Sequence, residues 1–339
     1  DTEVEAFNTV LFRATGTQSV TGMGFKPDLV WVKARSTSGS HHLMDSVRGA
    51  SKFLQSDTTD AEATSATFLT SFDDDGFSFG SNNWSDGRSM VAWGWKAGDS
   101  NVSNTDGSIT STVRDNDTYG FSIVSYTGNS TDGATVGHGL GATPDFIIIK
   151  SRSSTGGWIV YHSAITTNDA HRLQLNDSGA LFTSGTPFWE LSAFSNSVFG
   201  LGNNNSVNDG DDHIAYCWAE KSGYSKFGSY TGDSTNGVTV SVGFKPAFLL
   251  VKNTSHANNW FILDNTRQVP EGLKDDALFP NSSSAEITNQ PNNYGITFTD
   301  TGFEVNTTGD YNSNSNNSTG DTYIYAAFAD TREAAFWLD

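Results

Sequence analysis

A ten-residue motif occurs three times in this chain, and it limits the possible fold more than any other feature of the sequence. The copies lie at residues 24–33 (GFKPDLVWVK), 141–150 (GATPDFIIIK) and 243–252 (GFKPAFLLVK). Each copy reads as a turn followed by a strand, because a proline fixes the entry and apolar residues follow it. The copies are separated by roughly 100 residues, which is the length of a small domain. The spacing therefore predicts a tandem array of related modules.

Three further landmarks recur in the same order after each motif. A second strand follows at residues 41–46, 158–163 and 260–265; a third landmark lies at 76–79, 197–200 and 302–305; and a closing strand lies at 92–95, 215–218 and 325–328. Four landmarks in one order, repeated three times, indicate duplication of an ancestral unit.

The composition favours β-structure. Asn, Ser, Thr, Gly and Asp crowd the segments between apolar runs, which is typical of a fold with many turns. We predict an all-β protein of three tandem β-sandwich modules of the jelly-roll or lectin-like kind. The expected modules are residues 1–100, 101–222 and 223–334, followed by a C-terminal tail at 335–339. Because the stretch that connects modules two and three is short, these two modules are expected to pack closely.

The closing strand alternates small and aromatic residues. In Ala92-Trp93-Gly94-Trp95 the small side chains face one way and the indoles the other, since side chains alternate across a strand. This pattern fits a two-layer sandwich in which small residues allow close approach of the sheets and aromatic residues fill the remaining volume. The tryptophans at strand positions are expected in the core: Trp31, Trp93, Trp95 and Trp218.

Charge excludes one class of partner. With 19 basic and 38 acidic residues the net charge is −19, which repels phosphate backbones and anionic lipid, so we expect no nucleic acid ligand. The longest strictly apolar runs are far too short for a membrane span, so no membrane insertion is expected. The single cysteine, Cys217, allows no internal disulfide.

Two exposed-looking aromatic residues are candidate ligand contacts. Trp84 and Tyr311 lie in comparable polar loops before the closing strand, amid Asn, Asp and Ser. A ring in such a loop can stack on the C–H groups of a sugar while amides bind the hydroxyls. The alternative is a loop held in place by its own aromatic side chain.

Three more tryptophans complete the set of candidate glycan contacts. Trp158 and Trp260 start the second strand of modules two and three, where module one has His41, and could line a groove or pack in the core or at the sheet edge. Trp189 has no counterpart in the other copies, which favours a private role, although neighbouring Phe188 also fits a local hydrophobic plug.

No catalytic or metal motif is present, so we do not expect an enzyme. The histidines lack ligand spacing, and no nucleophile elbow, phosphate-binding loop or dinucleotide fingerprint occurs. Clustered carboxylates at 73–75 and at 209–212 leave structural calcium open beside the simpler reading of solvated acidic turns. A glycosidase would need two carboxylates placed across a scissile bond, and it remains the enzymatic alternative.

The first motif copy, with Leu43-Met44-Asp45-Ser46-Val47-Arg48-Gly49 after it, resembles a module common in predicted virion proteins of marine tailed bacteriophages. The ending at 323–333 (YIYAAFADTRE) is similar to the close of that module array. The similarity covers nearly the whole chain. It implies a tail-fibre, tail-tip or other surface-appendage protein, often considered lectin-like, and it supplies no catalytic residues. Module two departs most, with Ala142-Thr143 for Phe-Lys and His162 for the aspartate.

The sequence thus predicts a bacteriophage structural protein at the virion surface, in an extracellular setting, that binds host-surface glycan or receptor through exposed loops. Expected partners are other virion proteins and further copies of the chain, with a trimer among the forms considered. Weak sites repeated along the chain would gain affinity through effective concentration. The alternatives are a purely structural appendage or capsid-decoration subunit without ligand, and a cell-surface adhesin or filament subunit.

Overall fold

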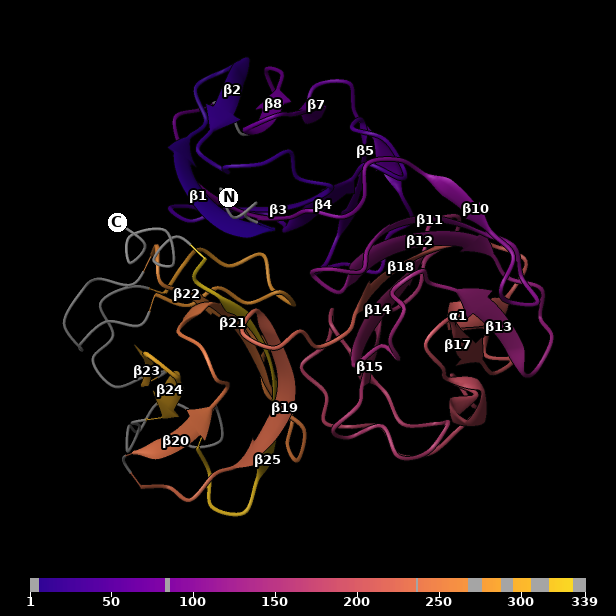
Figure 1. Ribbon diagram of the computed structural model, residues 1–339. Coiled ribbons are helices and arrows are strands. Elements are labelled where there is room, and N and C mark those ends of the chain that lie inside the picture. The colour runs from indigo at the N-terminus through magenta and orange to yellow at the C-terminus, as the bar shows by residue number, and fades with distance from the viewer. Residues whose placement is uncertain are drawn as a thin grey trace.

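The computed structural model describes residues 6–82, 86–235, 237–267, 276–287, 295–305 and 317–331. It is 45% strand and 2% helix, so the prediction of an all-β protein is confirmed. For description we divide the strands into three consecutive segments: segment one at residues 7–95, segment two at 102–218 and segment three at 225–329. In Figure 1 the three segments lie around a common centre.

The elements of segment one are β1 (Phe7–Arg13), β2 (Gln18–Thr21), β3 (Leu29–Ala34), β4 (His42–Asp45), β5 (Lys52–Gln55), β6 (Ala63–Thr64), β7 (Leu69–Asp73), β8 (Gly76–Phe79) and β9 (Ser89–Trp95). Those of segment two are β10 (Val102–Asn104), β11 (Ser111–Asn116), β12 (Phe121–Thr127), β13 (Ala134–Gly137), β14 (Phe146–Ser151), β15 (Ile159–His162), β16 (Leu173–Gln174), η1 (Leu191–Ala193), β17 (Val198–Leu201), α1 (Asn205–Asn208) and β18 (Asp212–Trp218). Segment three has β19 (Ser225–Thr231), β20 (Val238–Ser241), β21 (Pro246–Asn253), β22 (Phe261–Asp264), β23 (Ile296–Thr299), β24 (Gly302–Val305) and β25 (Thr322–Ala329).

Each segment builds one large and one small antiparallel sheet. The large sheets share the orders β1-β9-β3-β4, β12-β18-β14-β15 and β19-β25-β21-β22, and in the described strands every pairing joins strands of one segment. The register is also shared, because Trp95 pairs with Leu29, Trp218 with Phe146, and Phe328 with Phe248. The repeated motifs of the sequence therefore occupy equivalent places in the three sheets.

The small sheet covers one face of the large sheet. In segment one, side chains of β2, β7 and β8 pack against β1, β3, β4 and β9 in one buried cluster, and segments two and three each have a corresponding cluster. The layers approach closely at Gly94, where an added Cβ would lie 2.7 Å from the Met23 sulfur. Small residues of the closing strand thus permit the sandwich, as the alternation predicts.

The aromatic residues of the closing strands do not fill that sandwich. Trp93, Trp95, Trp218 and Phe328 point to the opposite face and join one buried cluster to which all three segments contribute. The Trp95 ring lies 6.2 Å from Trp218 and 5.6 Å from Phe328, measured between ring centroids. Figure 1 shows the three large sheets turned toward this centre, with the small sheets on the outside. The expectation that the aromatic face completes each module's own sandwich is therefore wrong.

The same pair of backbone hydrogen bonds joins each segment to the next. Three bonds of 2.9 Å occupy equivalent places, and three more of 2.7–2.8 Å lie beside them. The first set is Glu62 N to Arg152 O, Leu181 N to Thr254 O and Glu286 N to Arg35 O; the second is Gly156 N to Thr59 O, Asn258 N to Ser178 O and Gly39 N to Ser283 O. The last member of each set returns from segment three to segment one, so the segments form a closed ring.

Replacing Trp95 with alanine tests the shared core. Trp95 contacts aromatic rings of all three segments, so we expect Trp95→Ala to lower the free energy of unfolding by about 3–5 kcal/mol, as for other buried large-to-small changes. Denaturant unfolding followed by tryptophan fluorescence and circular dichroism measures this. The control Leu11→Ala, at an exposed position, should change stability by less than about 0.5 kcal/mol. Equal losses in the two variants would contradict the assignment.

Candidate binding cleft

Buried carboxylate–arginine pairs lie at the end of β4 in segment one and at the end of β22 in segment three. Asp45 Oδ2 lies 2.5 Å from Arg48 Nε, and Asp264 Oδ2 lies 2.5 Å from Arg267 Nε, with all four side chains fully buried. Each aspartate also accepts a hydrogen bond from the next segment in the ring. Tyr216 Oη donates to Asp45 at 2.8 Å, and Trp93 Nε1 donates to Asp264 at 2.9 Å. These charges are fully partnered and connect the segments, which is a structural role.

Segment two has His162 where the other segments have aspartate. Its Nε2 donates to the Tyr325 carbonyl of segment three at 3.1 Å, and its Nδ1 accepts from Ala164 N at 3.2 Å. Burial lowers the pKa of His162 to about 4, so the ring is neutral at neutral pH. His162 therefore contacts the next segment in the ring, as Asp45 and Asp264 do, but this contact is a hydrogen bond of a neutral ring.

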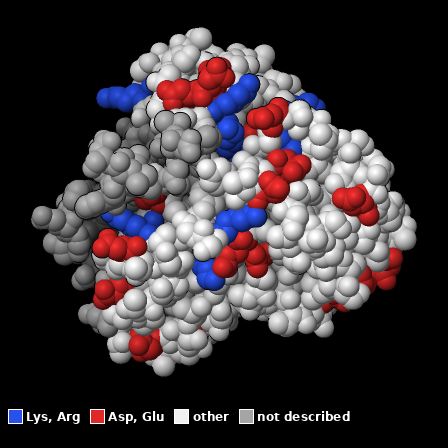
Figure 2. All heavy atoms as spheres, viewed as in Figure 1, with Lys and Arg blue, Asp and Glu red and all other residues white. Residues whose placement is uncertain are grey.

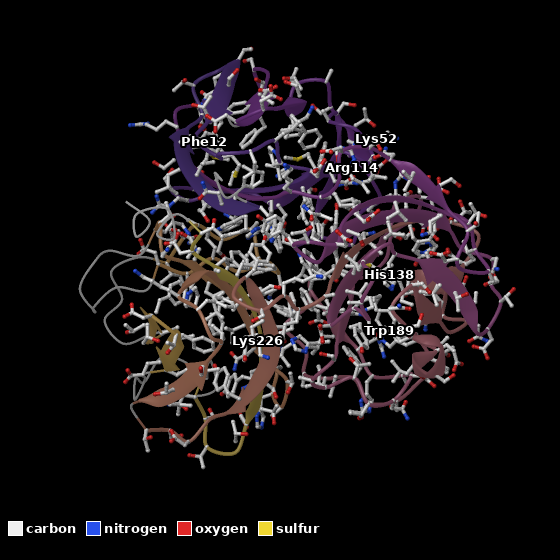
Figure 3. All side chains as sticks on the ribbon, in the orientation of Figure 1. Phe12, Lys52, Arg114, His138, Trp189 and Lys226 are labelled. Atoms are coloured by element: carbon white, nitrogen blue, oxygen red, sulfur yellow. The ribbon has the colours of Figure 1, made fainter. Side chains whose placement is uncertain are left out.

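The three joints of the ring differ in charge. At the joint of segments one and two, Arg152 Nε lies 2.9 Å from Glu62 Oε2, and Arg114, labelled in Figure 3, lies 2.6 Å from Asp28. At the joint of segments three and one, Arg35 Nε lies 2.7 Å from Glu286 Oε2. In the part of the chain that the structure describes, no ion pair joins residues 102–218 to residues 227–329; Lys226, near the start of β19 (Ser225–Thr231), pairs with Glu220 of the stretch that joins β18 to β19.

The lysine that ends each repeated motif is buried. Lys33, Lys150 and Lys252 are each 0% exposed, and each Nζ donates to the carbonyl of the following residue at 2.7–2.9 Å. Burial lowers the pKa to about 8 for Lys33 and Lys150 and to about 7 for Lys252. Lys252 Nζ also donates to Ser178 O of segment two at 3.2 Å, so it lies at the joint without an ion pair.

A cleft opens at one end of this same joint, between segments two and three. Its volume is about 480 Å³, and four short stretches line it: residues 118–119, 221–224, 244–245 and 329–331. The first precedes β12, the second joins β18 to β19, the third precedes β21 and the fourth follows β25. The cleft therefore exists because strand ends from two segments meet there. Lys226 of β19, labelled in Figure 3, belongs to segment three and pairs at 2.6 Å with Glu220 of the stretch that joins β18 to β19.

Two tyrosines form an aromatic wall of the cleft. The rings of Tyr119 and Tyr224 meet edge to face with centroids 4.9 Å apart, and Tyr224 lies 6.1 Å from Phe328 of the shared core. Burial, with a smaller effect of nearby Tyr119, raises the pKa of the Tyr224 hydroxyl well above its usual value, so the phenol stays protonated. Tyr119 is half-buried and reaches the cleft. The wall is thus fixed to the rigid centre of the molecule.

Positively and negatively charged side chains, together with a hydroxyl group, complete the lining of the cleft. Lys221 and Lys245 supply ammonium groups, Asp330 supplies a carboxylate, and Ser222 supplies a hydroxyl. Asp330 is itself held by a hydrogen bond from the Asn265 side chain and by its N–H to Lys245 O at 2.9 Å. Aromatic faces beside hydrogen-bonding groups are typical of a site for a small polar ligand such as a sugar. Among the described residues that line the cleft, Asp330 carries the carboxylate.

Trp158 and Trp260 do not form a glycan surface. They are 0% and 1% exposed, and each indole points into the neighbouring segment. Trp158 Nε1 donates to Gln55 O at 2.9 Å, and Trp260 Nε1 donates to Gln174 O at 2.8 Å. The structure corrects their assignment as ligand contacts and supports the alternative of core packing, because an enclosed ring offers no face to a sugar.

Trp189 is also enclosed. It is 0% exposed, packs edge-on against Tyr161 and donates from Nε1 to His171 O at 2.9 Å. Figure 3 shows it inside segment two. Its assignment as a ligand contact is corrected, and the hydrophobic plug with Phe188 is the better description. Trp84 and Tyr311 lie outside the described residues, and the structure does not place them.

The acidic clusters close turns in the described part of the chain. Asp75 accepts hydrogen bonds from Gly22 N at 3.0 Å and Gly24 N at 2.7 Å, while Asp211 N donates to Asp209. Among the described residues no group of three or more His, Cys, Asp or Glu side chains is arranged to hold a metal ion. The same residues contain no helix with the length and apolar character that a membrane span requires.

Sequence reasoning missed the cleft and the buried arginines. The arginines had a signal, because Asp45-x-x-Arg48 recurs as Asp264-x-x-Arg267 at matched positions. The cleft had none, since its four stretches are far apart in the sequence and only the ring of segments brings them together.

Comparison with known families gives one match. The chain belongs to the family described as "Domain of unknown function (DUF7483)", whose model matches residues 3–332. Comparisons with curated proteins and with solved structures found no match.

Lys252 gives a pH-dependent prediction. Burial lowers the pKa of Lys252 from the usual lysine value of 10.5 to about 7 in the folded protein, so the unfolded chain binds more protons between these pH values. Folding is therefore penalised fully below pH 7, and the penalty disappears as the pH rises toward 10. We expect wild type to gain stability relative to Lys252→Met between pH 7 and pH 10 in denaturant titrations.

Lys26→Met serves as the control, because Lys26 is exposed. Its difference from wild type should stay constant over the same range. A constant difference for Lys252→Met as well would contradict the burial of a proton-binding amine at this joint.

Proposed function

We propose that this chain is a structural protein of a bacteriophage virion, part of a tail fibre or another surface appendage, and that it binds host-surface glycan in the cleft between segments two and three. Three copies of one β-sandwich module, arranged as a closed ring, form its body. The proposal combines the sequence resemblance to virion modules with the cleft, and the cleft is the observation that carries the binding role.

The lining supports a sugar ligand on physical grounds. The half-buried Tyr119 ring can pack against the C–H face of a pyranose, and Lys221, Lys245 and Asp330 can bind its hydroxyls. A volume of about 480 Å³ is within the usual range for small-molecule sites, which is about 300–1,000 Å³. The cleft also borders the shared aromatic core, so its walls are preorganised and a ligand orders few side chains on binding.

The surface charge is consistent with a neutral or mixed-charge ligand. On the face shown in Figure 2, acidic and basic side chains lie close together, and no extended basic patch is present on that face. The chain as a whole carries a net charge of −19, which disfavours polyanionic partners at long range. Recognition would therefore depend on short-range contacts in the cleft.

A purely structural role without ligand is the second candidate function. The closed ring of segments, with its buried ion pairs and aromatic centre, supports it, because such a body needs no ligand to be stable. A glycan array and a host-cell binding assay separate the two candidates. Wild-type protein that binds neither glycan nor cells would contradict the binding role and favour the structural one.

Two variants locate the site if wild type binds. Tyr119→Ala removes the stacking ring, and Lys221→Gln removes an ammonium donor while leaving the core intact. Each should weaken glycan binding roughly tenfold, equivalent to about 1.4 kcal/mol. Leu11→Ala, exposed on segment one, should bind as wild type. Unchanged binding in both cleft variants, with loss in Trp84→Ala or Tyr311→Ala, would move the site to those loops.

A further inference from the structure

Arg172 of segment two occupies an unusual position between two aromatic rings. Its guanidinium carbon lies 4.2 Å from the centroid of Phe182 and 4.2 Å from that of Phe188. The backbone fixes this arrangement, since Arg172 and Phe182 exchange two hydrogen bonds of 3.0 and 3.2 Å. Phe188 is fixed by its N–H to Asp169 O at 2.9 Å, and the buried Trp189 next to it donates to His171 O. The side chain is thus held in one orientation.

The guanidinium lacks hydrogen-bond partners. Its Nε and Nη1 atoms are buried without any partner among the described residues, and the third nitrogen, Nη2, is not among the enclosed atoms. Ring faces attract the positive charge but accept no strong hydrogen bonds from in-plane N–H groups. A buried donor that is left without an acceptor destabilises the folded protein. The edge of the guanidinium is therefore polar, positively charged and unsatisfied.

The other enclosed arginines show what is missing here. Arg48 and Arg267 are each bound by a buried aspartate at 2.5 Å and by a second carboxylate of Glu62 or Glu286. In Arg172, burial alone lowers the pKa, and no carboxylate of the described residues offsets it. A chain with 38 acidic residues could supply a partner easily. The absence of one at a fixed arginine suggests that the partner comes from outside the chain.

We propose that Arg172, with Phe182 and Phe188, is a binding site for the oxyanion group of a small ligand, either a carboxylate or a phosphate. The exposed Nη2 of the planar guanidinium can donate a charge-assisted hydrogen bond to an oxygen of such a group, and the positive charge that the two rings hold in place attracts the group's negative charge. The half-exposed Phe182 ring borders the guanidinium and can pack against the apolar part of the ligand. The site is separate from the cleft and does not depend on glycan binding there.

The backbone places of Arg172 and Phe182 recur in the other segments, where Phe53 pairs with Ala63 and Ala277 pairs with Ile287, but those pairs carry no arginine. The chain between β15 and β17 carries Arg172, both rings and Trp189, and the repeated landmarks do not include it. Side chains that differ from those at the equivalent places of the other two segments are a natural place for a function that those segments lack.

Calorimetry and side-chain NMR test the proposal with three probes: glucuronate, inorganic phosphate and the neutral control glucose. We expect saturable binding of glucuronate or phosphate, a shift of one arginine Nε–H resonance on titration, and no effect of glucose. Binding of one anion but not the other identifies the source of the oxyanion. Rising salt should weaken the binding, because the contact is charged.

Three variants assign the effect to this residue. Arg172→Lys keeps the charge but loses the planar guanidinium that stacks between Phe182 and Phe188 and holds Nη2 in place, so its affinity should fall roughly tenfold. Arg172→Gln should abolish binding and the ligand-induced rise in melting temperature. Arg88→Gln is the matched control, since Arg88 is already paired with Asp86 at 2.8 Å and should not contribute. Failure of wild type to bind either anion, or wild-type affinity in Arg172→Gln, would overturn the proposal.

Discussion

The large sheet of each segment has two hydrophobic faces, and its own small sheet can cover only one of them. The second face carries the aromatic residues of the closing strands, among them Trp95, Trp218 and Phe328. Leaving these rings in water would cost about 1.5–3 kcal/mol for each large side chain. Packing the three faces together removes them from solvent at once. The arrangement of the whole chain follows from this requirement.

The ring of segments determines where the polar features lie. Each segment reaches the next through the same backbone hydrogen bonds and through the last side chain of β4, β15 or β22, which is Asp45, His162 or Asp264. Two joints carry buried or partly buried ion pairs, and the third carries the neutral His162 and the buried Lys252. The cleft opens at the end of this third joint. Divergence between the copies has thus changed the charged contacts at the joint of segments two and three. The backbone hydrogen bonds between segments are the same at all three joints.

The sequence predicts the elements well, because they depend on local pattern. The motif prolines, the apolar runs after them and the alternation at 92–95 are enough to place the central strands and to define an all-β protein. The burial of Trp31, Trp93, Trp95 and Trp218 is also confirmed. The division into modules that fold separately stays a prediction, because the segments share one buried cluster.

Long-range geometry is what the sequence does not contain. Trp158 and Trp260 could equally cap an edge or line a groove, and only the position of the neighbouring segment shows that their indoles are enclosed. The cleft joins four stretches from two segments, and the isolation of Arg172 depends on which carboxylates fail to reach it. Such properties arise from packing between segments, which no local periodicity encodes.

Native-state hydrogen exchange, followed by mass spectrometry at increasing denaturant, tests the shared core most directly. If the aromatic centre holds the three segments together, then β3, β14 and β21 should lose protection in one common opening event with the same free energy. Separate openings of the three strands, each with its own free energy and denaturant dependence, would contradict the account and describe three independent domains.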